Sequence, residues 1–213
     1  MIFLESRNEV DEQGIGNLGI CTSGGYVFFA AETDERINGV GTVSGVDMGD
    51  LFRKGLPSSM APNLQNLFKE SGKARTEARG QPPRMEHIVS NTPEEVPKDA
   101  PTLYRERTDY YLTPRGQHPN SKNWFLLKIV DQNAENSSYE HVDMISPRPL
   151  LMIAGTNADT RFFGEEAIEK AKTPKEIFLI DGATHVALYD KREHVDPAVD
   201  KLNSFYKQYL HAG

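Results

Sequence analysis

Short apolar runs, separated by polar loops, recur along the chain and predict the strands of a parallel sheet. They lie at residues 15–21, 40–46, 150–155 and 176–181, and they are too short to form helices of ordinary length. The first two runs flank an apolar segment that begins at about Ser23. Because strand, helix and strand follow one another here, the pattern predicts a β-α-β unit and therefore a parallel sheet.

Helical patterns follow the last two predicted strands and also mark the start of the chain. Residues 163–171 are expected to be helical, and residues 2–4 resemble the tail of a helix before a polar loop. The segment 197–210 carries apolar side chains at helical spacing, at Val199, Leu202, Phe205, Tyr206 and Tyr209. This last segment is therefore predicted to be an amphipathic helix that packs on the sheet.

The middle of the chain, residues 48–133, has a different character, with many proline, glycine and charged residues and only short apolar patches. Residues 63–70 and 100–111 are predicted to be short helices, and residues 72–97 a loop. The run WFLLKIV at 124–130 is too short for its periodicity to distinguish a helix from a strand.

We interpret the region of about 48–140 as a helical cap inserted into one α/β domain that spans residues 1–213. Its aromatic side chains are candidates for the wall of a substrate pocket: Tyr104, Tyr110, Tyr111 and Trp124. The alternative interpretation is that these aromatic residues form the small core of the cap itself.

Composition narrows the class of protein. The net charge of −7 argues against a nucleic-acid-binding protein, which would need a basic face. No apolar run approaches the roughly 20 residues that span a bilayer, and the first residues are unlike a signal peptide, so we expect no membrane association. The single cysteine excludes an intrachain disulfide and fits a reducing cytoplasm. Any thiol chemistry must therefore use Cys21.

The segment around Cys21 has the pattern of a nucleophile elbow, G-x-S-x-G, with cysteine at the serine position and Ser23 at the second glycine position. Such a sharp strand-to-helix turn strains its central residue, so small residues must flank it, as Gly19 and Ser23 do here. At a helix N-terminus the thiolate is favoured, and the N–H of Thr22 could face an oxyanion. The alternative is a buried structural cysteine.

A second glycine pattern competes with this interpretation. Gly14, Gly16 and Gly19 form G-x-G-x-x-G, and Asp34 follows at a distance that suits a ribose-binding carboxylate. A dinucleotide-binding fingerprint must follow a strand and open a helix. Here the preceding residues are polar and the glycines lie in the strand itself, so we predict no dinucleotide cofactor.

Three residue types suited to acyl transfer follow three of the predicted strands. Cys21 follows the first strand, Asp159 the third and His185 the fourth, so all three belong to the carboxyl edge of one parallel sheet. His185 would accept the thiol proton, and the carboxylate would hold the imidazole and stabilise its cation. Asp47, after the second strand, is an alternative acid, whereas Asp181 is too near His185 in sequence.

No metal site is expected. The remaining histidines are scattered and lack a carboxylate or thiol partner at ligand spacing: His87, His118, His141, His194 and His211.

Several strings together resemble an alpha/beta-hydrolase family related to the dienelactone hydrolases: IGNLGICTSGGY, VSGVDMG, TPRGQHPNS, ISPRPLLMIAGTNADT and GATHVALYD. The resemblance implies a hydrolase or acyltransferase with Cys21 as nucleophile, Asp159 as acid and His185 as base. The family's acid position falls one residue earlier, at Ala158. The resemblance covers only the C-terminal two-thirds of such proteins, so it implies a partial fold without the N-terminal strands and their oxyanion-binding loop.

These observations predict an enzyme that acts on the ester, thioester or lactone bond of a small acyl substrate, without a cofactor. Transfer of the acyl group to an amine or alcohol is one alternative, and a truncated remnant that binds without turnover is another. An apolar strand at 15–21 without its neighbours would have an open edge, which invites aggregation unless a second chain pairs with it in a homo-oligomer.

Overall fold

The computed structural model describes residues 1–57 and 63–210, and its contacts divide the chain into two units. Residues 1–47 together with the segment after Asn136 form one unit, which we call the sheet unit. Residues 48–136 form the second, which we call the insert. That the insert acts as a cap stays a prediction.

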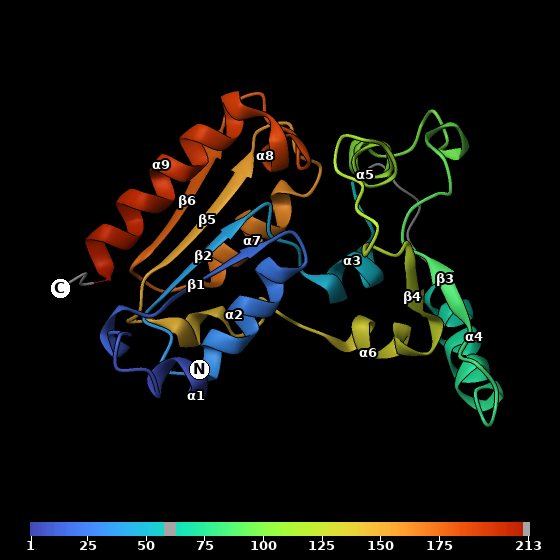
Figure 1. Ribbon diagram of the computed structural model, residues 1–213, viewed down its shortest axis with the longest axis horizontal. Coiled ribbons are helices and arrows are strands. Elements are labelled where there is room, and N and C mark those ends of the chain that lie inside the picture. Colours follow the sequence, from blue (N-terminus) through green and yellow to red (C-terminus); the bar gives the residue numbers. More distant parts are fainter. Residues whose placement is uncertain (58–62, 211–213) are drawn as a thin grey trace. The chain divides into compact units, whose positions relative to one another are not determined.

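Four parallel strands form the sheet, as predicted. They are β1 (Gly16–Ile20), β2 (Gly39–Val43), β5 (Leu150–Gly155) and β6 (Lys175–Ile180), in the order β1-β2-β5-β6. Each neighbouring pair is parallel. The carboxyl ends of the strands therefore meet at one edge of the sheet (Figure 1). In sequence, Cys21 follows β1, Asp159 follows β5 and His185 follows β6.

Helices cover both faces of this sheet (Figure 1). Helix α2 (Ser23–Thr33) and helix α7 (Arg161–Lys170) pack on one face. Helix α9 (Arg192–Tyr209) packs on the other, after the short α8 (Ala187–Asp190). Helix α9 begins upstream of the predicted start at 197 and contains Pro197, which removes one intrahelical hydrogen bond and crowds the preceding turn.

The core on the α9 face is apolar. Its buried members come from β2, β5, β6, the loop after β6, α8 and α9: Val43, Leu151, Ile153, Ile180, Ala183, Leu188, Ala198 and Phe205. Glycines allow α9 to approach the sheet, since a Cβ on Gly41 would lie 2.6 Å from the Tyr206 hydroxyl oxygen. Burial of this face fixes the register of the strands that carry the candidate site.

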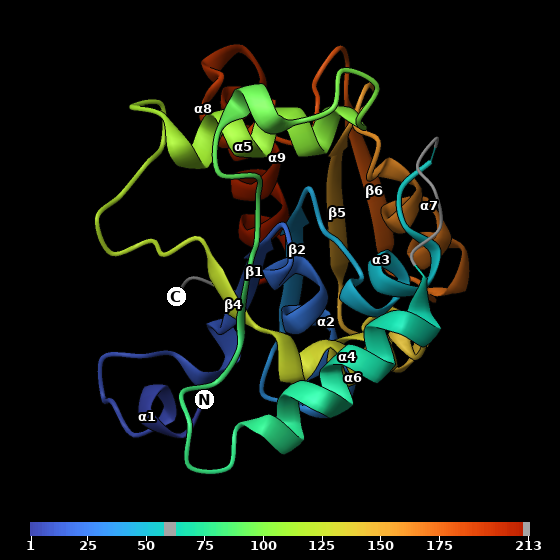
Figure 2. The ribbon, with the colours of Figure 1, turned by 90° about the vertical axis from the view of Figure 1, so that its right-hand side faces the viewer.

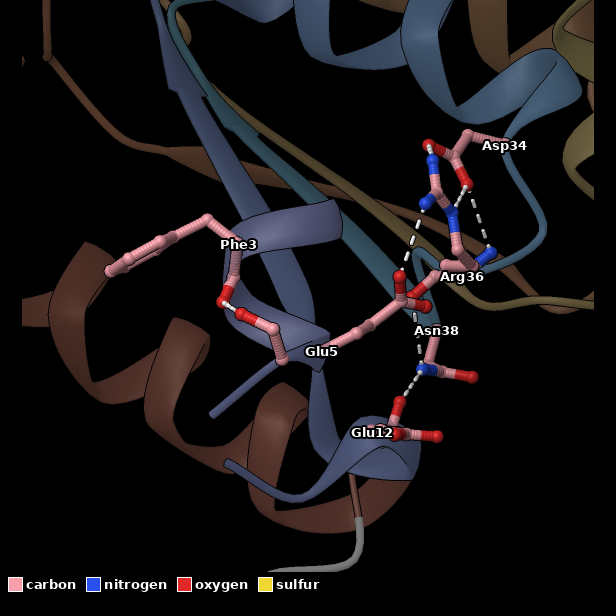
Figure 3. A network of polar contacts seen from close by, with 7 residues as sticks. Phe3, Glu5, Glu12, Asp34, Arg36 and Asn38 are labelled. Atoms are coloured by element: carbon pink, nitrogen blue, oxygen red, sulfur yellow. Dashed lines mark hydrogen bonds and ion pairs between the residues drawn. The ribbon is translucent and has the colours of Figure 1, made fainter. Parts of the chain in front are cut away.

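The first residues form a short helix, α1 (Ile2–Glu5), and a 3-10 turn, η1 (Glu12–Gly14). Both are tied to the loop between α2 and β2 (Figure 3). Arg36 pairs with Asp34 at 2.7 Å and with Glu5 at 3.1 Å, and Asn38 donates to the carbonyl of Glu12 at 2.9 Å. Asp34, the candidate ribose ligand of the glycine pattern, is therefore engaged by an arginine.

The insert contains helices α3 (Met48–Lys54), α4 (Leu64–Glu77), α5 (Thr102–Leu112) and α6 (Val130–Glu135). Helix α4 lies beside α6 (Figure 2). A two-stranded antiparallel sheet joins β3 (Met85–His87) to β4 (Trp124–Leu126), and 3-10 turns lie at η2 (Pro93–Glu95) and η3 (Leu127–Ile129).

One prediction for the insert was wrong, and the structure answers one question that periodicity left open. Residues 72–97 are not all loop, because α4 continues to Glu77 and β3 and η2 follow. The run 124–130 is neither one helix nor one strand, since it passes from β4 through η3 into α6. Pairing of β3 with β4, remote in sequence, decides this division.

In the loop before β5 lies the 3-10 turn η4 (Val142–Ile145), which packs against α2 near a buried carboxyl group, that of Glu32. Burial raises the pKa of Glu32 to about 7 from 4.5, and the backbone N–H of His141 opposes this shift. The nearby charges of Asp143, Asp47 and Glu140 raise the pKa further.

Because the unfolded chain loses the Glu32 proton at lower pH than the folded protein, this carboxyl is expected to destabilise the fold progressively between about pH 4.5 and about pH 7. Glu32→Gln should therefore stabilise the protein at pH 8 more than at pH 4.5, as measured by chemical unfolding at both pH values. Glu169→Gln, on the exposed side of α7, is the control and should give no such difference. An equal effect of Glu32→Gln at both pH values would contradict the prediction.

Strand β1 lies at the edge of the sheet and exposes Leu18 (44%) and Ile20 (49%) on one face. Within the described part of the chain, only β2 pairs with it. An apolar edge strand is a template for pairing with other chains, and an edge lysine prevents such pairing. Leu18→Lys is therefore expected to lower concentration-dependent self-association in sedimentation experiments. Val199→Lys, at an equally exposed position (45%) on α9, should not.

Among the described residues, no helix combines the length and apolar character needed to cross a membrane.

Candidate active site

Cys21 lies at a strained strand-to-helix turn, as its sequence pattern predicts. Its φ is +57°, in the left-handed region that a non-glycine residue rarely adopts. Its N–H donates to the Val43 carbonyl at 3.1 Å, and its own carbonyl accepts from Gly24 and Val46 at 2.9 and 3.1 Å. The turn is thus held by β2 on one side and by the first turn of α2 on the other.

Glycine is required at position 19, two residues before Cys21. A Cβ on Gly19 would lie 2.2 Å from the carbonyl oxygen of Ser23, which is closer than any real contact. Thr22 is the N-cap residue of α2, and its hydroxyl lies 3.8 Å from the Cys21 sulfur. The use of the Thr22 N–H as an oxyanion donor stays a prediction.

His185 lies in the loop after β6 and is 1% exposed. Its carbonyl accepts a hydrogen bond of 3.0 Å from the hydroxyl of Ser44, the residue that follows β2. Ser44 also has a positive φ, +49°, and its N–H donates to Ile153 on β5. The end of β2 therefore holds both the Cys21 turn, through Val43, and the His185 loop, through Ser44.

Both ring nitrogens of His185 have hydroxyl partners. Nδ1 lies 2.6 Å from Oγ1 of Thr160, and Nε2 lies 2.8 Å from the hydroxyl oxygen of Tyr189. The ring of Tyr189 packs edge-on against the imidazole. In a triad, the acid binds Nδ1 of the histidine. Here Thr160, the residue after the predicted acid Asp159, contacts that atom. The role of Asp159 stays a prediction.

Asp47, the alternative acid, is buried at the end of the loop after β2. Its Oδ2 accepts from the backbone N–H of Tyr139 at 3.1 Å. Burial, and then the charges of Asp47 and Cys21, raise the pKa of the Tyr139 hydroxyl, which therefore stays neutral. Asp47 thus contacts the backbone of Tyr139, whereas Thr160 and Tyr189 contact the ring of His185.

The four candidate pocket residues all lie in the insert and contact other groups there. The ring of Tyr104 lies 4.4 Å from the Arg107 guanidinium, and the rings of Tyr110 and Tyr111 meet edge-on at 5.1 Å. Trp124 stacks on His87 at 3.8 Å and is 47% exposed. That they line a substrate pocket stays a prediction.

Over the described ranges 1–57 and 63–210, no three His, Cys, Asp or Glu side chains are grouped so that they could hold a metal ion.

Sequence reasoning missed Ser44, Thr160 and Tyr189. One signal was available, because His185 and Tyr189 are four residues apart, which places two side chains on one side of a helical turn. No comparable signal exists for Ser44, whose partner is 141 residues away.

No family model matches the chain. YcjY of Escherichia coli, an uncharacterized protein, is 29% identical over 211 residues, covering 98% of this chain and 68% of YcjY. The uncharacterized protein PA2218 of Pseudomonas aeruginosa is 31% identical over 217 residues, covering 98% of this chain and 56% of PA2218. This chain therefore spans between about half and two thirds of the length of these relatives.

Solved structures resemble the whole chain. The crystal structure of PA2218 superposes with a TM-score of 0.86 at 30% identity, over 98% of this chain and 65% of that one. The alpha/beta hydrolase GrgF from Penicillium sp. sh18 gives a TM-score of 0.78 at 18% identity, over 98% and 68%. The chain thus has an α/β fold with a mainly parallel sheet and helices on both faces, and its structural neighbours include alpha/beta hydrolases.

Proposed function

We propose that the protein is an acyl hydrolase that attacks an ester, thioester or lactone carbonyl through the Cys21 sulfur. One observation carries this proposal: Cys21 adopts a left-handed backbone conformation at a strand-to-helix turn. A non-glycine residue held in such a conformation is costly and is typical of functional sites. The fold on which it occurs supports the same conclusion.

In the proposed reaction, His185 accepts the thiol proton and the sulfur adds to the carbonyl carbon. The Thr22 N–H stabilises the oxyanion, and the imidazolium then gives its proton to the departing alcohol or thiol. Water, deprotonated by His185, attacks the acyl-enzyme and releases the acid. Asp159 is the proposed acid that stabilises the imidazolium, with Asp47 as the alternative.

Hydrogen bonds from both Cys21 and His185 to the end of β2 support the proposal that they act together as nucleophile and base. The Cys21 N–H binds Val43 and the His185 carbonyl binds Ser44, so adjacent residues of one strand end position nucleophile and base. Second contacts of this kind hold reacting groups in place before substrate arrives.

The test is to mix the protein with short-chain p-nitrophenyl esters and thioesters, quench with acid and measure intact mass. We expect a mass increase of one acyl group, and peptide mapping should find it on Cys21. Turnover without modification of Cys21 would contradict the proposal. An added amine or alcohol that changes the product from acid to amide or ester would favour the acyltransferase alternative, and neither adduct nor product would favour a binding module.

A further inference from the structure

A buried hydrogen bond joins the two points at which the chain leaves the sheet unit for the insert and returns from it. The insert begins at Met48, directly after Asp47, and ends at Asn136, shortly before Tyr139. Within the sheet unit, Oδ2 of Asp47 accepts from the backbone N–H of Tyr139 at 3.1 Å, although the two residues are 92 apart in sequence. Both residues are buried. The two connections of the insert are therefore held together at this point.

The side chain of Tyr139 packs against the loop that ends at Asp47, residues 44–47. A Cβ on Gly45 would lie 2.6 Å from the Tyr139 hydroxyl oxygen, so this oxygen lies against the loop. The Tyr139 ring also meets Phe28 of α2 edge-on, with 5.5 Å between the ring centroids. Tyr139 thus contacts the loop through both its backbone and its side chain, and it contacts α2 as well.

The 44–47 loop also binds the nucleophile and the base of the proposed reaction. The hydroxyl of Ser44 donates to the carbonyl of His185 at 3.0 Å. The N–H of Val46 donates to the carbonyl of Cys21 at 3.1 Å. Because protein interiors are close-packed, a displacement of this loop must also displace the groups that are bonded to it.

We propose that Asp47 is a positioning residue. With the Tyr139 N–H it forms a clasp between the two connections of the insert, and this clasp keeps the 44–47 loop in the conformation that holds Cys21 and His185. The clasp requires an acceptor oxygen at position 47, whereas a triad acid requires a negative charge. The consequence for activity rests on the proposed function, but the coupling between the clasp and the loop does not.

Amide hydrogen exchange, resolved for single residues by NMR, tests the clasp without using activity. Asp47→Ala removes the acceptor and should speed exchange of the Tyr139 N–H and of the Val46 N–H, each by about tenfold or more. Asp47→Asn keeps an acceptor oxygen and should leave both amides near their native rates. The control is the N–H of Ala171, which donates to the carbonyl of Ala167 at 3.0 Å and should not change in either variant.

Faster exchange at Tyr139 without faster exchange at Val46 would overturn the proposal, because the loop would then be held without the clasp. Equal acceleration at Ala171 would overturn it too, since the substitution would then loosen the whole sheet unit. In the native protein, the Tyr139 and Val46 amides should open together and have protection factors within about threefold of each other. A difference of more than about tenfold between them would contradict the proposal even if Asp47→Ala fails to fold.

The proposed function adds an expectation for ester hydrolysis. Asp47→Ala should lower kcat/KM by about 10- to 100-fold, because a small displacement of reacting groups is costly, and Asp47→Asn should recover most of this loss. Asp11→Ala, which removes the carboxylate acceptor of the Gln13 N–H in the same unit, is the control and should keep the native rate.

Equal losses in Asp47→Asn and Asp47→Ala would show that activity needs the charge of Asp47 and would overturn its assignment as a positioning residue. If the native protein neither hydrolyses esters nor is alkylated at Cys21, the proposed function is contradicted. The exchange rates of the Tyr139 and Val46 amides then decide by themselves whether the clasp exists.

Discussion

Replacing Cys21 with alanine is expected to lower the rate of ester or thioester hydrolysis by about 1,000-fold or more. Without the sulfur no acyl-enzyme forms, and only binding and the oxyanion donors remain to accelerate attack by water. The measurement is the steady-state rate with p-nitrophenyl esters, under conditions in which circular dichroism verifies that the variant is folded. A Cys21→Ala variant that retains native activity would exclude Cys21 as the nucleophile.

A double variant tests whether Cys21 and His185 act together in catalysis. Residues that act as one unit are strongly non-additive, so Cys21→Ala combined with His185→Ala should be little slower than either single variant. If the fold reduction in rate of the double variant equals the product of the two single fold reductions, the two residues act independently.

Cys21→Gly is the matched control for the backbone. It should be as inactive as Cys21→Ala, but it should be more stable, by about 1 kcal/mol, because glycine adopts a φ of +57° without the strain that a Cβ causes. If the alanine variant were the more stable of the two, the turn would not have the strained conformation on which the proposed function rests.

Gly19→Ala is expected to have the largest effect on stability, a loss of about 3 kcal/mol in the free energy of unfolding. The new Cβ would meet the Ser23 carbonyl oxygen at 2.2 Å and the Gly24 nitrogen at 2.6 Å. These are backbone atoms of the first turn of α2, so no side-chain rotation relieves the overlap. The start of α2 must move away from β1, and the Cys21 turn must open.

Denaturant unfolding of Gly19→Ala and Gly164→Ala measures this effect with a control in the same unit. A Cβ on Gly164, inside α7, would meet its nearest neighbour, Ile177, at an ordinary 3.5 Å, and alanine favours a helix over glycine by up to about 1 kcal/mol. Gly164→Ala should therefore be neutral or stabilising. Similar stabilities for the two variants would contradict the close approach of α2 to β1.

The amino-acid sequence by itself determined the layers of the sheet unit. Buried parallel strands are short apolar runs, and 150–155 was located to the residue as β5. The small residues around Cys21 likewise identified the turn, because only such residues allow a helix to start so close to the preceding strand. Because Cys21, Asp159 and His185 each follow one predicted strand of a parallel sheet, the sequence also assigned them to the carboxyl edge of that sheet.

Only the tertiary structure decided the partners of the histidine and the course of the insert. The contact of Thr160 with His185 joins residues 25 apart in sequence, and that of Ser44 with His185 joins residues 141 apart. Each depends on the sheet order β1-β2-β5-β6, which no local pattern encodes. Similarly, WFLLKIV became strand, turn and helix because β3 pairs with its first three residues. The local pattern of apolar residues thus determines where helices and strands form. Which polar side chains come into contact depends on the pairing of strands that are remote in sequence.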